Sequence, residues 1–170
     1  MIRLLCGAVA LLGLLSVTAR ADDKSPANDR DFVAHMAKGG FAEVKLGELA
    51  EKRAANPKVK EFGARMVKYH TDANNKLSEV ARAQKIAVAA GLDQESRQMF
   101  MDLSRLQGEE FDRHYMKMMV EDHEKDVSMV EDYAKKAMDP AIKKFCEDTL
   151  PTLREHLKMA KEVNDLVNKK

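Results

Sequence analysis

Two dipeptides, Asn56-Pro57 and Asp139-Pro140, divide the chain into long helical segments. Proline is tolerated at the first position of a helix and disfavours helix in the residue before it, so each dipeptide ends one helix and begins the next. In four segments, apolar residues recur every three or four positions, which is the spacing of one helix face. These segments are 29–55, 57–86, 109–138 and 140–168. We therefore predict four long amphipathic helices that form two antiparallel hairpins.

The composition and the connector between the hairpins define the expected fold class. Lys, Glu, Ala and Leu are abundant, aromatic residues make up only 5% and Trp is absent, which favours an all-α protein. Gly91 should end the helical pattern in the connector, and a short helix is expected over about 94–106. A connector of this length suits a bundle with one long crossover. We predict an all-α, ferritin-like four-helix bundle with a short crossover helix between the two hairpins.

One ionisable residue interrupts each apolar stripe, at a position where Leu or Val would be ordinary. The four residues are Glu43, His70, His123 and His156. The first two are equally far from Asn56-Pro57, and the last two are equally far from Asp139-Pro140. At about 1.5 Å rise per residue, the two pairs lie roughly 20 and 25 Å from their turns. Because a crossover places the turns at opposite ends, all four side chains can meet near the middle of the bundle.

Neutral imidazole and carboxylate groups are usual ligands of transition metals. The sequence therefore predicts one ion of zinc, iron or copper, held by Glu43, His70, His123 and His156. The alternative is a closed polar network, because buried groups without partners cost about 1–3 kcal/mol each. In that network Glu43 accepts hydrogen bonds from the imidazoles, and the network is completed by Asp72, Asp122, Asp126, Tyr69 or Tyr115. The two interpretations stay open at this point.

Other metal chemistry and common catalytic motifs are less favoured. A di-iron centre needs Glu-x-x-His motifs, but the residues three positions before the histidines are Val67, Val120 and Leu153. The thioethers of Met116, Met118 and Met119 suit Cu(I), although methionine at helical spacing more often fills a core. No Gly-rich phosphate loop, Ser-His-Asp spacing or CxxC is present. The sequence names no reaction, and an enzyme is not favoured.

The first residues carry a targeting signal. A basic start, an apolar run over 4–17 and the sequence Ala19-Arg20-Ala21 indicate a secretory signal peptide over residues 1–21. We expect a disordered leader over 22–28 and a single domain over 29–168. The apolar run is shorter than the about 18 residues that a transmembrane helix needs. Export is predicted, with the protein in the periplasm or loosely held at the outer membrane.

The charge and the cysteine content of the chain limit its possible partners and crosslinks. Loss of Arg3 and Arg20 with the signal peptide leaves basic residues almost equal in number to the 28 acidic ones. A balanced surface offers no basic stripe for nucleic acid. Cys146 is the only thiol left, so no internal disulfide can form. We predict a periplasmic metal-binding or stress-protective protein; the alternative is a non-catalytic protein that binds an envelope partner through a bundle with a hydrogen-bonded core.

Several motifs together resemble one family. They include Gly39-Gly40-x-x-Glu43, Met66-Val67-x-x-His70, Val120-x-Asp122-His123 and Leu150-Pro151-x-Leu153-x-x-His156. These motifs are similar to those of the domain of unknown function 4142 family, which are exported bacterial proteins often labelled outer membrane proteins. The resemblance extends over about 29–165. It implies a ferritin-like bundle and export, and it supplies no established reaction.

Overall fold

The computed structural model describes residues 26–88 and 91–169, and its secondary structure in those ranges is helical. The helices are α1 (Asp29–Arg53), α2 (Pro57–Ala83), α3 (Gln94–Ser104), α4 (Gly108–Lys136) and α5 (Pro140–Asn168). The all-α prediction is confirmed. The predicted signal peptide and most of the predicted leader lie outside the described residues. In the described ranges, no helix is both long and apolar enough to cross a membrane.

Side-chain caps explain where α2 and α5 begin. The side chain of Asn56 accepts a hydrogen bond from the Lys58 amide at 2.9 Å. Asp139 likewise accepts from the backbone of the first turn of α5, with the Ala141 nitrogen at 2.8 Å. Pro57 and Pro140 are the first residues of their helices. Both Asx–Pro dipeptides therefore act as predicted, with the Asx residue satisfying backbone N–H groups that the helix leaves without a partner.

Helix α2 ends at Ala83, a turn earlier than the apolar spacing indicated. Lys85 takes a left-handed conformation with φ of 54°. The Lys85 amide donates to the Arg82 carbonyl, and the Ile86 amide donates to the Ala81 carbonyl at 2.8 Å. This is a Schellman motif, in which glycine usually occupies the left-handed position. The sequence prediction missed the helix end because lysine stands there instead.

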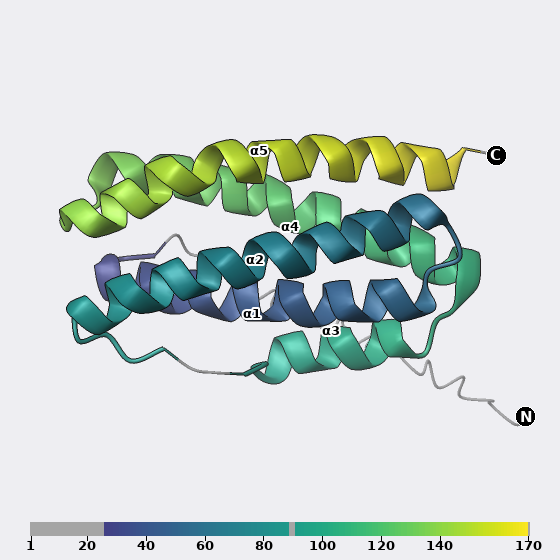
Figure 1. Cartoon of the computed structure of the whole chain (residues 1–170), viewed down its shortest axis with the longest axis horizontal. Coiled ribbons are helices and arrows are strands. Elements are labelled where there is room, and N and C mark those ends of the chain that lie inside the picture. Colours follow the sequence, from purple (N-terminus) through teal and green to yellow (C-terminus); the bar gives the residue numbers. More distant parts are fainter. Residues whose placement is uncertain (1–25, 89–90, 170) are drawn as a thin grey trace, which may run out of the picture.

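The four long helices lie side by side as two hairpins (Figure 1). Helix α1 packs mainly on α2, and α4 packs mainly on α5, with smaller contacts of α2 with α5 and of α1 with α4. The α1–α2 turn and the α4–α5 turn lie at opposite ends of the molecule. Helix α3 lies beside α1 and returns the chain along its length, so that α4 begins near the α1–α2 turn. The short helix predicted over about 94–106 is present.

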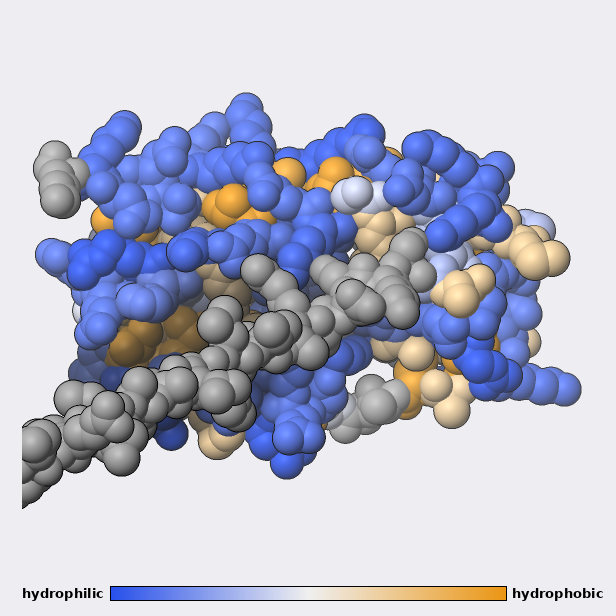
Figure 2. All heavy atoms as spheres, turned by 180° about the vertical axis from the view of Figure 1, so that it is seen from behind, coloured by the Kyte–Doolittle hydropathy of each residue, from blue (hydrophilic) through white to orange (hydrophobic). Residues whose placement is uncertain are grey.

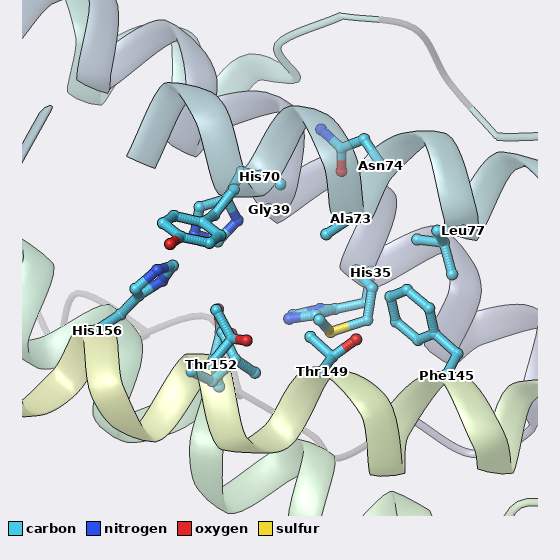
Figure 3. A pocket seen from close by; sticks show the side chains of 15 residues that line it. His35, Gly39, His70, Ala73, Asn74, Leu77, Phe145, Thr149, Thr152 and His156 are labelled. Atoms are coloured by element: carbon cyan, nitrogen blue, oxygen red, sulfur yellow. The ribbon is translucent and has the colours of Figure 1, made fainter. Parts of the chain in front are cut away.

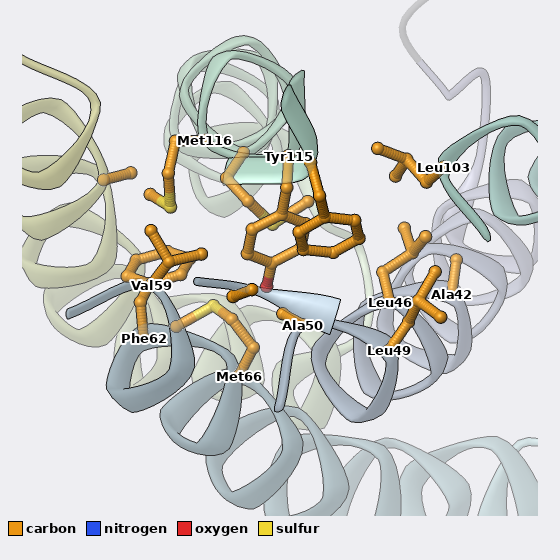
Figure 4. Close-up of a cluster of buried hydrophobic side chains, with 14 residues drawn as sticks. Ala42, Leu46, Leu49, Ala50, Val59, Phe62, Met66, Leu103, Tyr115 and Met116 are labelled. Atoms are coloured by element: carbon orange, nitrogen blue, oxygen red, sulfur yellow. The ribbon is translucent and has the colours of Figure 1, made fainter. Parts of the chain in front are cut away.

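The apolar core has two parts, one toward each end of the molecule. The first core cluster contains Phe62, Met66, Phe111, Tyr115 and Met116 among others (Figure 4). The second core cluster contains Phe32, Leu77, Val130, Tyr133, Ile142 and Phe145 among others. Along α2, α4 and α5, the residues of one cluster precede the inward histidine and those of the other cluster follow it. A polar layer therefore separates two apolar cores.

Candidate metal centre

The polar layer consists of one side chain from each long helix. Glu43 comes from α1, His70 from α2, His123 from α4 and His156 from α5. Their exposed fractions are 4%, 7%, 0% and 2%, respectively. All four face the interior, as the interrupted apolar stripes predicted. Because each helix is fixed by apolar residues on both sides of the layer, these side chains cannot turn to solvent without disrupting the core.

The three imidazoles form a triangle. The ring centroids lie 5.8 Å apart for His70 and His123, 5.6 Å for His70 and His156, and 5.5 Å for His123 and His156. One ring nitrogen from each histidine lies within 4.8 Å of the other two. Metal–nitrogen bonds of about 2.0–2.1 Å need donor atoms roughly 3–4 Å apart, which small rotations of the rings reach. We call this group the histidine triangle.

The ring orientation of His123 is fixed by its own helix. Its Nδ1 lies 2.9 Å from the carbonyl oxygen of Met119. A carbonyl can only accept, so Nδ1 carries the hydrogen, and in the neutral ring Nε2 carries the lone pair. That Nε2 is buried and has no hydrogen-bond partner in the described part of the chain. A histidine that ligates a metal usually donates its second nitrogen to a carbonyl or carboxylate in this way.

Glu43 lies beside the histidine triangle. Its Oε1 is 3.8 Å from Nδ1 of His123, a distance too long for a hydrogen bond. This nitrogen already donates to Met119, and the lone pair is on the far nitrogen of the ring. In the described residues, the set of donors that all lie within 4.8 Å of one another consists of the three histidines. The structure thus brings Glu43 to the cluster without placing it in that set.

Burial controls the protonation of the layer. It lowers the pKa of His123 to about 4 and that of His156 to about 3, with neighbouring charge on His123 and Arg65 adding to the shift of His156. It also lowers the pKa of His70 well below 6.5, and the other two imidazoles act in the same direction. The histidines are therefore neutral at pH 7, which is the form that binds metal. Burial, and then the charges of Asp122 and Asp126, raise the pKa of Glu43 well above 4.5.

Several buried polar atoms of the layer and its neighbourhood have no hydrogen-bond partner among the described residues. They are Glu43 Oε2, His70 Nε2, Tyr115 OH, His123 Nε2, and both Nδ1 and Nε2 of His156. A closed polar network, the alternative considered above, would satisfy these atoms and is not what the described residues form. Leaving them without partners costs about 1–3 kcal/mol each. The donor set, made of neutral nitrogens with free lone pairs, fits a transition-metal ion.

The remaining sulfur and imidazole groups are not part of the histidine triangle. Met116 and Met119 are fully buried in the first core cluster, so they act as core residues. Cys146 is buried in the second core cluster, and burial raises the pKa of its thiol to about 12, which makes it a poor metal ligand. His35 and His114 are exposed. Sequence reasoning did not find the cavity next to the histidine triangle, because it is formed by residues from four different helices.

Comparison with protein families identifies the relatives of this chain. The family described as "Domain of unknown function (DUF4142)" matches residues 15–163. The chain belongs to this family. The resemblance noted in the sequence is therefore confirmed. A comparison with curated proteins finds no match.

Solved structures with the same fold have little sequence in common with this chain. A DUF305 fragment from Deinococcus radiodurans has a TM-score of 0.70 at 16% identity, covering 83% of this chain and 99% of that one. CopM in the Cu(I)-bound form has a TM-score of 0.68 at 16% identity, with coverage of 84% and 99%. CopM in the Ag-bound form has a TM-score of 0.67 at 18% identity, with coverage of 84% and 98%. At these identities the likeness concerns the fold.

Proposed function

We propose that this DUF4142 protein binds one transition-metal ion, with His70, His123 and His156 as ligands and Glu43 as the adjacent carboxylate. The observation that carries the proposal is the histidine triangle, in which three buried neutral imidazoles lie within 4.8 Å. Nitrogens of all three lack a hydrogen-bond partner among the described residues. Apolar cores on both sides keep the rings in place. Such an arrangement lowers the stability of the metal-free protein, and binding of an ion raises that stability again.

Copper is the ion that we favour, ahead of zinc and iron. Imidazole donors suit all three metals, and a site of three nitrogens serves copper in both common oxidation states. Proteins of similar fold have been solved with Cu(I), Cu(II) and Ag bound. Their ligands are not carried over to this chain at 16–18% identity. The choice of copper therefore rests on the donor set and on the fold together.

We further propose that the protein is exported and acts in metal binding or stress protection in the bacterial envelope, as a ferritin-like four-helix bundle with α3 as its crossover. A protein that holds copper in a buried site keeps the ion away from proteins and other large molecules. Export is tested by N-terminal sequencing of the protein recovered from osmotic-shock fluid. The expected N-terminus is Asp22, after cleavage behind Ala21. Recovery of the chain from the cytosol with Met1 intact would contradict export.

A binding surface for an envelope partner has less support. Figure 2 shows a face dominated by hydrophilic residues, with hydrophobic ones in small separate groups. The exposed large hydrophobic residues of the described part are Tyr69, Met101, Met138 and Leu166. They belong to α2, α3, the α4–α5 turn and α5, so they do not form one extended patch of the kind that marks a protein interface.

Elemental analysis of protein purified without an affinity tag is the direct test of metal binding. We expect about one equivalent of metal in protein loaded with copper and dialysed. Calorimetry should show a higher melting temperature with Cu(II) or Zn(II) than with chelator, because the ion binds only the folded state. A wild-type protein that melts at the same temperature with metal and with chelator would show that the histidine triangle is not a metal site.

A further inference from the structure

A cavity of about 40 Å³ adjoins the histidine triangle. It is lined by residues of α1, α2, α4 and α5, and His70 and His156 form one end of its wall (Figure 3). Leu77 and Phe145 lie at the other end, and His35 projects between the two ends. His123 and Glu43 are not among the lining residues. The cavity therefore meets the triangle at His70 and His156.

The cavity is partly open to solvent. His35 is exposed and Tyr69 has 36% of its surface exposed, and both residues line the cavity. The ring of Tyr69 packs against the edge of His156, with centroids 5.2 Å apart. A water needs about 10–15 Å³ of such volume, so the cavity holds about three or four waters. Small molecules can reach the triangle from this side, and large ones cannot.

Helix α1 contributes to the space through its glycines. A Cβ at Gly39, which lines the cavity, would meet no heavy atom within 4 Å. A Cβ at Gly40 would instead clash with the side chain of Asn74. At Gly47 the new Cβ would lie 2.6 Å from the carbonyl oxygen of Gly63, where α1 and α2 are in close contact. Gly40 and Gly47 thus permit close packing, whereas Gly39 leaves open volume.

The ligand count leaves one coordination position free. The described donors within mutual reach are three histidines, and metal sites with three protein ligands usually bind an exogenous fourth ligand. Three neutral imidazoles leave the charge of a divalent ion uncompensated. An ionised Glu43 beside His123 would offset one positive charge. A monovalent anion bound to the ion would lower the remaining positive charge on the ion further.

We propose that an ion in the histidine triangle takes a small monodentate inorganic anion from the cavity as its fourth ligand. Hydroxide is the ligand of this class that water supplies, and azide is its experimental counterpart. This inference rests on the proposed metal site and specifies that site as open to exchange. A closed site, with Glu43 on the ion as the fourth ligand, is the opposing arrangement.

The test is azide titration of protein loaded with Cu(II). Metal content is measured first, so that failure of the metal site is recognised before azide is added. We expect azide to produce a ligand-to-metal charge-transfer band that saturates at one equivalent per copper. Gly39→Leu should fill the cavity and weaken azide binding at least tenfold, with the copper content unchanged. Gly39→Ala is the matched control and should bind azide as the wild type does.

A second cavity-filling variant guards against misfolding of the first. Thr152→Leu adds bulk from α5 on another wall of the cavity and should weaken azide binding in the same way. Three results would overturn the proposal. Copper-loaded wild type could show no azide band, both filled variants could bind azide with wild-type affinity, or azide could bind only after Glu43→Gln. The last result would place Glu43 on the ion.

Discussion

Asp112 and Glu43 are both buried carboxylates in the same bundle, but their surroundings differ. Asp112, with 2% of its surface exposed, lies near the start of α4 and reaches the α1–α2 turn. Its two oxygens accept hydrogen bonds from the Ala55 and Asn56 amides at 3.1 and 2.8 Å. Glu43 lies in the polar layer, and its Oε2 has no partner among the described residues. Both oxygens of Asp112 thus accept hydrogen bonds within the fold, whereas one oxygen of Glu43 has no partner in the described part of the chain.

The opposite end of the bundle repeats the arrangement of Asp112. Asp29, the first residue of α1, accepts hydrogen bonds from the Tyr133 hydroxyl at 2.6 Å and from the Asp139 amide at 2.9 Å. It thereby ties the beginning of α1 to the α4–α5 turn. Each hairpin turn is thus held by an aspartate from the other hairpin. The two ends of the molecule satisfy their own polar groups, and the middle layer does not.

This difference separates structural from functional polar groups. A carboxylate that accepts two backbone N–H groups stabilises the fold whatever else is bound. Imidazoles with free lone pairs in an apolar interior lower the stability of the protein alone, and such groups persist where a ligand uses them. The ends of the bundle therefore account for its assembly, and the layer between the two cores accounts for its proposed function. The predictions below test this division.

The largest expected effect is on metal affinity. His123→Ala should weaken copper binding about a thousandfold or more, equivalent to about 4 kcal/mol, because one of three ligands is lost in a site without a substitute. His114→Ala is the matched control, since His114 lies on the same helix and its Nδ1 is also 2.9 Å from the carbonyl four residues earlier, but its ring is exposed. Competition with a chelator of known affinity measures both. Equal affinities in the two variants would contradict the site.

The metal-free protein should lose stability on acidification. The pKa of His123 is about 4 and that of His156 about 3 in the folded protein, compared with 6.5 for each in the unfolded chain. At a pH between the folded and the unfolded value, the unfolded chain therefore binds more protons than the folded protein does. The free energy of unfolding therefore drops as the pH falls from about 7 toward 4. By pH 4 we expect a loss on the order of 3 kcal/mol for each of these two histidines, and His70 acts in the same direction.

Glu43 acts in the opposite direction. Its pKa is raised in the folded state, so its contribution to the free energy of unfolding is greatest below pH 4.5. That contribution is lost as the pH rises through the raised pKa. One opposing group against three leaves a net loss in acid. Denaturant titrations at several pH values, with chelator present, measure the slope, and His156→Leu should reduce it. A flat profile between pH 7 and 4 would contradict the burial of neutral imidazoles.

Removal of the two acids should have different consequences for stability. Asp112→Ala leaves two backbone N–H groups at the α1–α2 turn without their acceptor, and we expect a loss of about 2 kcal/mol with copper affinity unchanged. Glu43→Leu removes a carboxylate that lacks one partner, so the metal-free protein should be as stable as the wild type or more stable. Denaturant unfolding with chelator measures both variants. A larger loss for Glu43→Leu than for Asp112→Ala would reverse the proposed roles.

The smallest expected effect concerns the charge of Glu43. Glu43→Gln keeps the size of the side chain and removes its ability to ionise, so Cu(II) affinity should fall about tenfold, roughly 1.4 kcal/mol. Cu(I) affinity should change less, since the single positive charge of Cu(I) needs less compensation by a carboxylate. Parallel titrations of the two oxidation states measure the ratio. A loss as large as that of His123→Ala would show that Glu43 is itself a ligand.

The features that follow from local chemistry were predictable from the sequence. Asn56-Pro57 and Asp139-Pro140 set the hairpin turns, because capping and the ring of proline act within a few residues. The positions of Glu43 and His70 relative to one turn, and of His123 and His156 relative to the other, follow from the constant rise of the helix. The class of fold and the meeting of four polar side chains were therefore contained in the spacing.

Sequence reasoning was least successful where a residue departs from the usual pattern. Helix α2 ends where Lys85 takes a left-handed conformation. A glycine at this position would have predicted the helix end, but a lysine does not. A glycine in a helix can permit close packing or leave space, and both occur in α1. Gly47 contacts α2, whereas Gly39 faces the cavity. The spacing of the residues could not assign one role to each glycine, because the answer depends on the neighbouring helix.

The tertiary structure alone decided what the polar layer can do. The sequence placed Glu43 and three histidines at one level, but only the packing showed that Glu43 lies on the Nδ1 side of His123 and that the cavity meets His70 and His156. The same holds for Asp29 and Asp112, whose partners are distant in the chain. Helical periodicity fixes the direction and height of a side chain to within a turn. Ligand sets, hydrogen bonds and cavities depend on ångström distances between helices, which are set by the packing of all the side chains together.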